Sequence, residues 1–281
     1  MEVAGKDIQN FQATVRSHST YNFSQYSINS LRRRLTRILL ELDMNMETMC
    51  SHMQDDAVFM DQIIHKVTVH TTELFRDPQI WIHLKKELLP SLSGKERIRI
   101  WHPGCSTGQE VYSMLMVLDQ LNLLERSEVY GSDLHEEILD LARLGTYKYH
   151  FNQSYLENFD RVMMDGNGVL SRENKKNWKK YFQIDETRDR IQMKLELRQK
   201  AVYKKMDLAQ DDNPFLVNFD LIVCRNVIIY FNTDLQDRVF ELFHHNLSDG
   251  GALLLGVHES IMGPYSKRFL KRSPFYFKAE E

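Results

Sequence analysis

Apolar residues follow a helical period in the first quarter of the chain. Between residues 27 and 67 they recur three or four positions apart, with polar breaks at 43–45 and 55–56. Over residues 30–42, one helix face collects Leu31, Leu35, Ile38, Leu39 and Leu42. Residues 1–26 are polar and show no period, which predicts at most one short helix there. The pattern therefore predicts a small all-helical domain over residues 1–69.

The pattern changes beyond residue 70. An amphipathic helix is expected up to residue 89, and short apolar runs then alternate with amphipathic segments. The expected strands are 98–102, 129–132, 201–206, 219–224 and 252–257, with a β pair near 268–278, and the expected helices are 109–121, 136–144 and 234–247. Such alternation is typical of an α/β domain with a parallel sheet covered on both faces. We assign it residues 70–281.

The middle of this domain does not continue the alternation. Residues 146–198 are irregular, with short helical pieces at 154–162 and 172–181 and a pattern of two short strands around a polar turn at 184–191. We expect a small β subdomain inserted in the α/β domain at about residues 146–198.

One turn carries the clearest chemistry. Gly104 and Gly108 lie between an expected strand and an expected helix, and Glu110 follows them. A phosphate loop would have a lysine after its last glycine, and an acid there would repel a pyrophosphate. A ligand with a cationic centre and hydroxyl groups, such as S-adenosylmethionine, suits the turn better. The alternative is an ordinary strand-to-helix turn of another α/β protein.

Further polar residues follow other expected strands. Asp133 comes directly after one strand, where an acid can accept hydrogen bonds from ribose hydroxyls or can cap the next helix. Arg225 and Asn226 follow a nearly continuous apolar strand. Polar groups in that position are costly unless they meet a ligand, a partner or a salt bridge. Because ligands bind beyond the carboxyl ends of parallel strands, we expect one polar edge.

Composition narrows the class of protein. The 281 residues are 42% hydrophobic and 27% charged, as in an ordinary globular protein, and a net charge of −3 gives no general attraction to nucleic acid or membranes. No apolar run approaches the roughly 18 residues of a membrane span, and residues 1–25 lack the apolar region of a signal peptide. We expect a cytoplasmic location. Three cysteines without a C-x-x-C pair argue against zinc and a disulfide framework, and no metal is expected.

Four motifs in order give a specific resemblance. They are Thr72-x-x-Phe75-Arg76-Asp77, the run from Cys105 to Ser113, Ser132-Asp133, and Cys224-Arg225-Asn226-Val227-x-Ile229-Tyr230-Phe231. From about Tyr26 onward the chain resembles the CheR-type chemotaxis receptor methyltransferases. The resemblance implies a Rossmann-like sheet, S-adenosylmethionine as cofactor, and methylation of glutamate side chains. An enzyme of the same fold with another acceptor, and an inactive cofactor-binding adapter, are the alternatives.

The resemblance also implies roles for individual residues. Methyl transfer would involve Arg76, Arg225 and Tyr230, and cofactor binding would involve His70, Thr72, Arg76, Gly104, Glu110, Asp133, Asp207, Arg225 and Asn226. Two positions depart from the family pattern: His70 stands where many members have Asn, and Asp207 stands where an Asn commonly contacts the adenine. An Asp carboxylate accepts hydrogen bonds from the adenine amino group but cannot donate to a ring nitrogen.

The implied partners are methyl-accepting receptors, whose cytoplasmic parts are acidic helical bundles, and the enzyme is expected to be a monomer. Arg33, Arg34 and Arg37 share one helix face, which is either a receptor-docking surface or an ordinary solvated face. The turn at 185–190 contains no glycine, which favours receptors without a C-terminal docking peptide. Cys105 and Cys224 are expected near each other, either as a redox pair or as small residues in tight turns.

Overall fold

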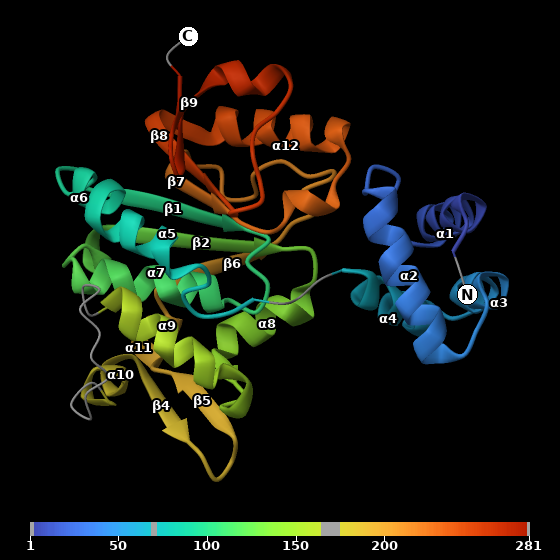
Figure 1. The fold of residues 1–281 in the computed structure, drawn as a ribbon, viewed down its shortest axis with the longest axis horizontal. Coiled ribbons are helices and arrows are strands. Elements are labelled where there is room, and N and C mark those ends of the chain that lie inside the picture. Colours follow the sequence, from blue (N-terminus) through green and yellow to red (C-terminus); the bar gives the residue numbers. More distant parts are fainter. Residues whose placement is uncertain (1–2, 69–71, 164–174, 280–281) are drawn as a thin grey trace. The chain divides into compact units, whose positions relative to one another are not determined.

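The computed structural model describes residues 3–68, 72–163 and 175–279 (Figure 1). The chain forms two compact units, Met1–Val69 with Val227–Phe240, and His70–Asn226 with Glu241–Glu281. The predicted domain boundary between residues 69 and 70 stays a prediction, because the residues on either side of it lie outside the described part. None of the described helices combines the length and the apolar character that crossing a membrane requires.

The first unit is built from helices. They are α1 (Gly5–His18), α2 (Ile28–Leu42), α3 (Met46–Asp55) and α4 (Ala57–Val67). The Asn45 side chain accepts a hydrogen bond from the first turn of α3, and Asp56 does the same for α4. Such capping satisfies backbone N–H groups that have no partner within the helix. These caps lie at the two predicted breaks, so the predicted helical N-terminal region is confirmed.

Helix α1 is longer than the expected short helix. Ile8, Phe11 and Val15 follow each other three and four residues apart and are buried. The many polar residues between them obscure the period. The same unit includes η4 (Ile228–Tyr230) and the start of α12 (Thr233–Asn246). Here the Ser27 N–H donates to the Tyr230 carbonyl at 2.8 Å.

A seven-stranded sheet forms the core of the second unit. Its strand order is β6-β2-β1-β7-β8-β10-β9. The first five strands in this order are parallel to one another, whereas β10 pairs antiparallel with both β8 and β9. The strands are β1 (Ile98–Pro103), β2 (Ser127–Asp133), β6 (Ala201–Lys205), β7 (Phe219–Cys224), β8 (Leu247–Leu255), β9 (Phe269–Arg272) and β10 (Phe275–Lys278). The predicted α/β fold is confirmed. Residues 248–251, between the expected helix at 234–247 and the expected strand at 252–257, also belong to β8, where the pairing with β7 is irregular.

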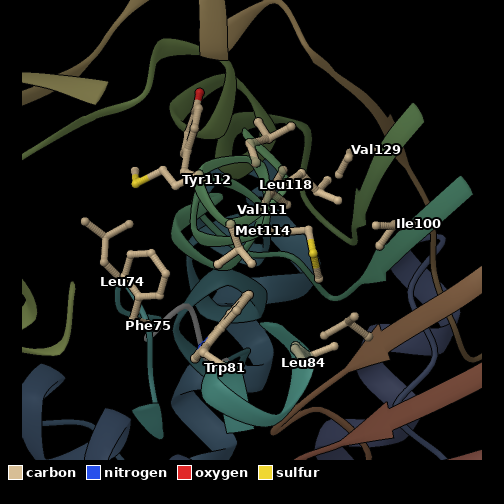
Figure 2. Close-up of a cluster of buried hydrophobic side chains, with 14 of the residues drawn as sticks. Leu74, Phe75, Trp81, Leu84, Ile100, Val111, Tyr112, Met114, Leu118 and Val129 are labelled. Carbon is tan, nitrogen blue, oxygen red and sulfur yellow. The ribbon is translucent and has the colours of Figure 1, made fainter. Parts of the chain in front are cut away.

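Helices precede and connect these strands. They are α5 (Pro78–His83), η1 (Leu84–Leu88), α6 (Leu89–Ser91), α7 (Gln109–Gln120), η2 (Leu124–Arg126), α8 (Glu136–Leu144) and η5 (Pro264–Arg268). Helix α7 is buried along nearly its whole length. Figure 2 shows its side chains between the sheet residues Ile100 and Val129 and the segment that carries Phe75 and Trp81. The segment before α5 is thereby fixed to the body of the sheet.

The insertion forms a second, three-stranded sheet in the order β3-β5-β4. It comprises β3 (Thr146–Tyr147), η3 (His150–Asn152), α9 (Gln153–Met163), α10 (Lys175–Tyr181), β4 (Phe182–Asp185), β5 (Arg190–Met193) and α11 (Leu195–Arg198). The predicted strand pair around a polar turn is present as β4 and β5, so the inserted β subdomain is confirmed. Residues 172–174 of the helical piece expected there lie outside the described residues.

Candidate functional site

The turn after β1 has the predicted strand, turn and helix order. Gly104, Ser106 and Gly108 have φ angles of 69°, 51° and 88°. A Cβ on Gly108 would lie 2.9 Å from the Cβ of Ala142, so this position needs glycine for both its backbone angle and its close packing. The turn brings the start of α7 against α8.

Asp133 ends β2 beside this turn, because β1 and β2 are parallel neighbours. Its Oδ2 accepts a hydrogen bond from the Ser106 N–H at 2.8 Å, and the residue is 9% exposed. Helix α8 has His135 at its N-cap, so the alternative that Asp133 caps the helix is wrong. The carboxylate instead fixes the glycine turn.

Glu110 lies in a cluster of charged groups around the buried side chain of Arg225. Its Oε1 is 3.1 Å from Nδ1 of His102, and its Oε2 accepts from Nη1 of Arg225 at 3.0 Å. Nη2 of Arg225 also donates to Oδ2 of Asp77 at 2.6 Å and to the Arg76 carbonyl at 2.9 Å. The Arg225 side chain is 1% exposed. Arg225 thus joins the end of β7 to the start of α7 and to the segment before α5, through one planar guanidinium group.

The protonation of Glu110 follows from this cluster. Burial raises the pKa of its carboxyl group, but the hydrogen bond with His102 and the charge of Arg225 outweigh burial, so the pKa lies below its ordinary value. The site therefore holds an ionised carboxylate at neutral pH. Of the cluster, His102 and Asp77 were not predicted as site residues. The only sequence signal for His102 is a polar residue at the end of a buried strand.

Arg76 contrasts with Arg225. It is half-buried, and among the described residues its side chain makes no hydrogen bond or ion pair. Its carbonyl accepts from both Arg225 and the Trp81 indole N–H. The flanking Phe75 and Asp77 have φ angles of 52° and 56°, which are unusual for residues with a side chain. The backbone of Arg76 is therefore held firmly, whereas its guanidinium group keeps its hydrogen-bonding capacity. The charge of Arg76 opposes burial, which raises the pKa of Glu73.

Asn226 follows β7 and Arg225 in a left-handed conformation, with a φ of 60°. Its N–H donates to Oε2 of Glu259 at 2.7 Å. The Asn226 Oδ1, the Ser106 Oγ and the His102 Nε2 are buried without a hydrogen-bond partner among the described residues. This edge of the sheet therefore holds the ionised Glu110 carboxylate together with polar atoms whose hydrogen-bonding capacity is not used among the described residues.

The other predicted site residues have varied surroundings. His70 lies outside the described residues, Thr72 is half-buried, and Tyr230 belongs to the first unit. Asp207 uses its carboxylate locally, accepting from the Ala209 N–H and the Gln210 amide. The structure thus brings Gly104, Glu110, Asp133, Arg225, Asn226 and the Arg76 backbone to one edge of the sheet.

Cys105 and Cys224 follow neighbouring strands, as expected, and both are free and buried. Burial raises the pKa of each thiol well above its usual value. Since the thiolate is the reactive form, the surroundings disfavour a redox role and favour close packing.

The glycine turn and the charge cluster lie within a match to a known family. A family model described as "CheR methyltransferase, SAM binding domain" matches residues 70–165 and 152–273. A Pseudomonas putida protein named as methyltransferase Cher3 is 33% identical over 252 residues, which are 89% of this chain and 87% of its own. The chemotaxis protein methyltransferase of Listeria monocytogenes is 26% identical over 275 residues, 97% of each chain. Chemotaxis protein methyltransferase 1 of Vibrio cholerae is 31% identical over 206 residues, 71% of this chain and 68% of its own.

Proposed function

We propose, since the chain belongs to the CheR methyltransferase family, that it methylates glutamate side chains in the cytoplasmic domains of chemotaxis receptors. The products would be glutamyl methyl esters. Relatives that match most of the chain are named chemotaxis protein methyltransferases, and these names support this acceptor class. The observation that carries the proposal is the contrast between the two arginines. Both terminal nitrogens of Arg225 donate to protein groups, whereas the guanidinium group of Arg76 makes no hydrogen bond among the described residues and can hold a carboxylate.

The cofactor is S-adenosylmethionine, the ligand of the matched domain. The residues present fit it: Glu110 is an ionised carboxylate suited to an amino group, and Asp133 is suited to ribose hydroxyls. Asn226 has a buried Oδ1 without a partner among the described residues. The carboxylate of Asp207 already accepts hydrogen bonds from Ala209 and Gln210. To contact the adenine as proposed, it must break these hydrogen bonds or accept a further one. His70 and Thr72 are proposed to complete the cofactor contacts.

The bound cofactor supplies an electrophilic methyl group on a sulfonium. A glutamate acceptor with a pKa of about 4.3 is already ionised at neutral pH, so the chain needs no general base. Its task is to align the carboxylate and to exclude water from it. We assign the alignment to Arg76, whose planar guanidinium group can bind a carboxylate bidentately. The role expected for Tyr230 stays a prediction. Arg225 then acts as a positioning residue for Glu110 and Arg76.

Replacing Asp133 by alanine is expected to weaken S-adenosylhomocysteine binding by roughly tenfold to a hundredfold, the usual loss for a hydrogen bond to a charged group. Isothermal titration calorimetry measures it directly. Asp133→Asn keeps an acceptor for the Ser106 N–H and separates loss of the turn from loss of ligand contacts. Asp140→Ala, at an exposed position on α8, is the matched control. An unchanged dissociation constant in Asp133→Ala would refute the role of Asp133.

The arginine face of α2 is proposed to dock the receptor. Arg33 and Arg37 are exposed, whereas Arg34 is half-buried with its Nε buried, so only the first two are reversed to glutamate. Arg37 pairs with Glu41, which keeps its second partner, Lys66, in the variant. We expect the KM for an acidic receptor fragment to rise roughly threefold to tenfold at low salt, because charge complementarity is lost.

Steady-state methylation at several receptor concentrations measures this change in KM, and calorimetry checks that cofactor affinity is unchanged. The matched control replaces Lys6 and Arg16 by glutamate, because both residues are exposed on α1 of the same unit. If both double reversals change KM alike, the effect comes from net charge and α2 is not the docking surface.

A screen with cofactor labelled in its methyl group tests the acceptor class. We expect transfer to a receptor cytoplasmic fragment and none to unrelated proteins or small carboxylic acids. Transfer to another acceptor alone would establish an enzyme of the same fold with a different substrate. Cofactor binding without transfer to any acceptor would indicate an adapter.

A further inference from the structure

Glu259 joins the ends of two central strands by its side chain. Its Oε2 accepts a hydrogen bond from the Gly256 N–H, just after β8, and another from the Asn226 N–H, just after β7, each at 2.7 Å. The residue is 8% exposed. Hydrogen bonds from N–H groups to an ionised carboxylate are shorter and stronger than bonds between neutral groups. One buried oxygen atom thus fixes the backbone on both strands.

Gly256 leaves the space that this carboxylate occupies. A Cβ at residue 256 would lie 2.6 Å from Oε2 of Glu259, and 3.1 Å from the backbone nitrogen of Asn226. Any residue other than glycine would displace the carboxylate or the Asn226 backbone. The turn closes with a hydrogen bond from the Glu259 N–H to the Gly256 carbonyl at 3.0 Å. Residues 256–259 therefore form a turn that packs closely against the backbone of Asn226 and supports it.

Asn226 needs such a support. Its φ of 60° is a left-handed conformation, which costs free energy for a residue with a side chain and persists where neighbouring groups hold it. Its Oδ1 is buried and has no partner among the described residues. The N–H bonded to Glu259 belongs to the same residue. Loss of the carboxylate would free the backbone and change the direction of the carboxamide.

We infer that Glu259 is a positioning residue for the cofactor, which acts by fixing the left-handed backbone of Asn226 and so aiming its carboxamide at S-adenosylmethionine. The inference rests on the proposed contact between Asn226 and the cofactor. A residue that only tied β7 to β8 would affect stability without a specific effect through Asn226. The two roles differ in whether the effects of Glu259 and Asn226 on cofactor affinity are coupled.

A double-mutant cycle on the full chain tests the coupling, with S-adenosylhomocysteine affinity measured by calorimetry. Glu259→Ala and Asn226→Ala are each expected to weaken binding by roughly tenfold. The double variant is expected to bind within about twofold of Asn226→Ala alone, because Glu259 is inferred to act on the cofactor through Asn226. Effects that multiply, or no effect in either single variant, would overturn the inference.

Two further variants keep the test decisive if Glu259→Ala does not fold. Gly256→Ala keeps both functional side chains and crowds the carboxylate, so we expect a comparable loss of affinity. Glu259→Gln retains one acceptor oxygen for the two N–H groups, and we expect it to bind more tightly than Gly256→Ala. Reversal of that order would contradict the inference. His258→Ala, exposed in the same turn, is the control for unchanged binding. No receptor is used, so failure of the proposed acceptor leaves this result standing.

Discussion

Arg76→Ala is expected to lower turnover by roughly a hundredfold or more, while the dissociation constant for S-adenosylhomocysteine stays within about threefold of wild type. Misplacing a reacting group by about 1 Å can cost this much in rate. The backbone of Arg76 is held by Arg225 and Trp81, so truncating its side chain leaves the surrounding cluster in place. The loss is then specific to alignment of the acceptor carboxylate.

Single-turnover methylation with saturating cofactor measures this step apart from product release. Arg76→Lys keeps the charge but not the planar fork, and we expect it to recover only part of the rate. Arg97→Ala, an exposed arginine of the same unit, is the matched control for a lost positive charge. Near-normal turnover in Arg76→Ala would remove Arg76 from the mechanism.

Arg225→Met is expected to lower the free energy of unfolding by about 3 kcal/mol, the usual range for breaking a buried ion pair. Asp77 and Glu110 would each lose their charged hydrogen bond with Arg225. Cofactor affinity should fall as well, because Glu110 would keep only His102 to orient it. Urea unfolding and calorimetry measure the two effects. Arg225→Lys cannot reach both acids with one ammonium group, so we expect an intermediate loss.

The pH dependence of Arg225→Met gives this prediction a second readout. In the wild type the pKa of Glu110 is lowered on folding, so its contribution is present above the ordinary carboxyl pKa and is lost as pH falls through the lower, folded value. Without Arg225, burial is opposed by His102 alone, and the pKa of Glu110 rises. Wild type should therefore lose more stability than the variant as pH falls through the carboxyl range, so the difference in unfolding free energy between the two proteins should narrow at acid pH. Parallel curves for both proteins would show that Arg225 does not control Glu110.

Local sequence was enough to predict the elements of the site. Gly104 and Gly108 mark the turn after β1, and the apolar run before Cys224 identifies a central strand, because both signals depend on neighbours in the chain. Asp133 was placed correctly at the end of β2 for the same reason. The polar edge of the sheet follows from parallel topology, in which the strands end on the same side.

The partners of these residues could not be predicted in this way. Arg225 meets Asp77 and Glu110 across more than a hundred residues of chain, and which acid it reaches depends on how three segments pack. Glu259 acts through backbone N–H groups, which no residue pattern identifies. Helix α1 was underestimated because packing by Phe11 and its buried neighbours, more than propensity, stabilises it.

The central claim is that the acceptor atom is a glutamate carboxylate oxygen on a chemotaxis receptor. The direct measurement is release of labelled methanol by mild base from a receptor cytoplasmic fragment, after incubation with this protein and methyl-labelled S-adenosylmethionine. We expect label that is lost in base, is located on glutamate side chains by mass spectrometry, and accumulates far more slowly with Arg76→Ala. Label that resists base, or that is located on a nitrogen or sulfur atom, would contradict it.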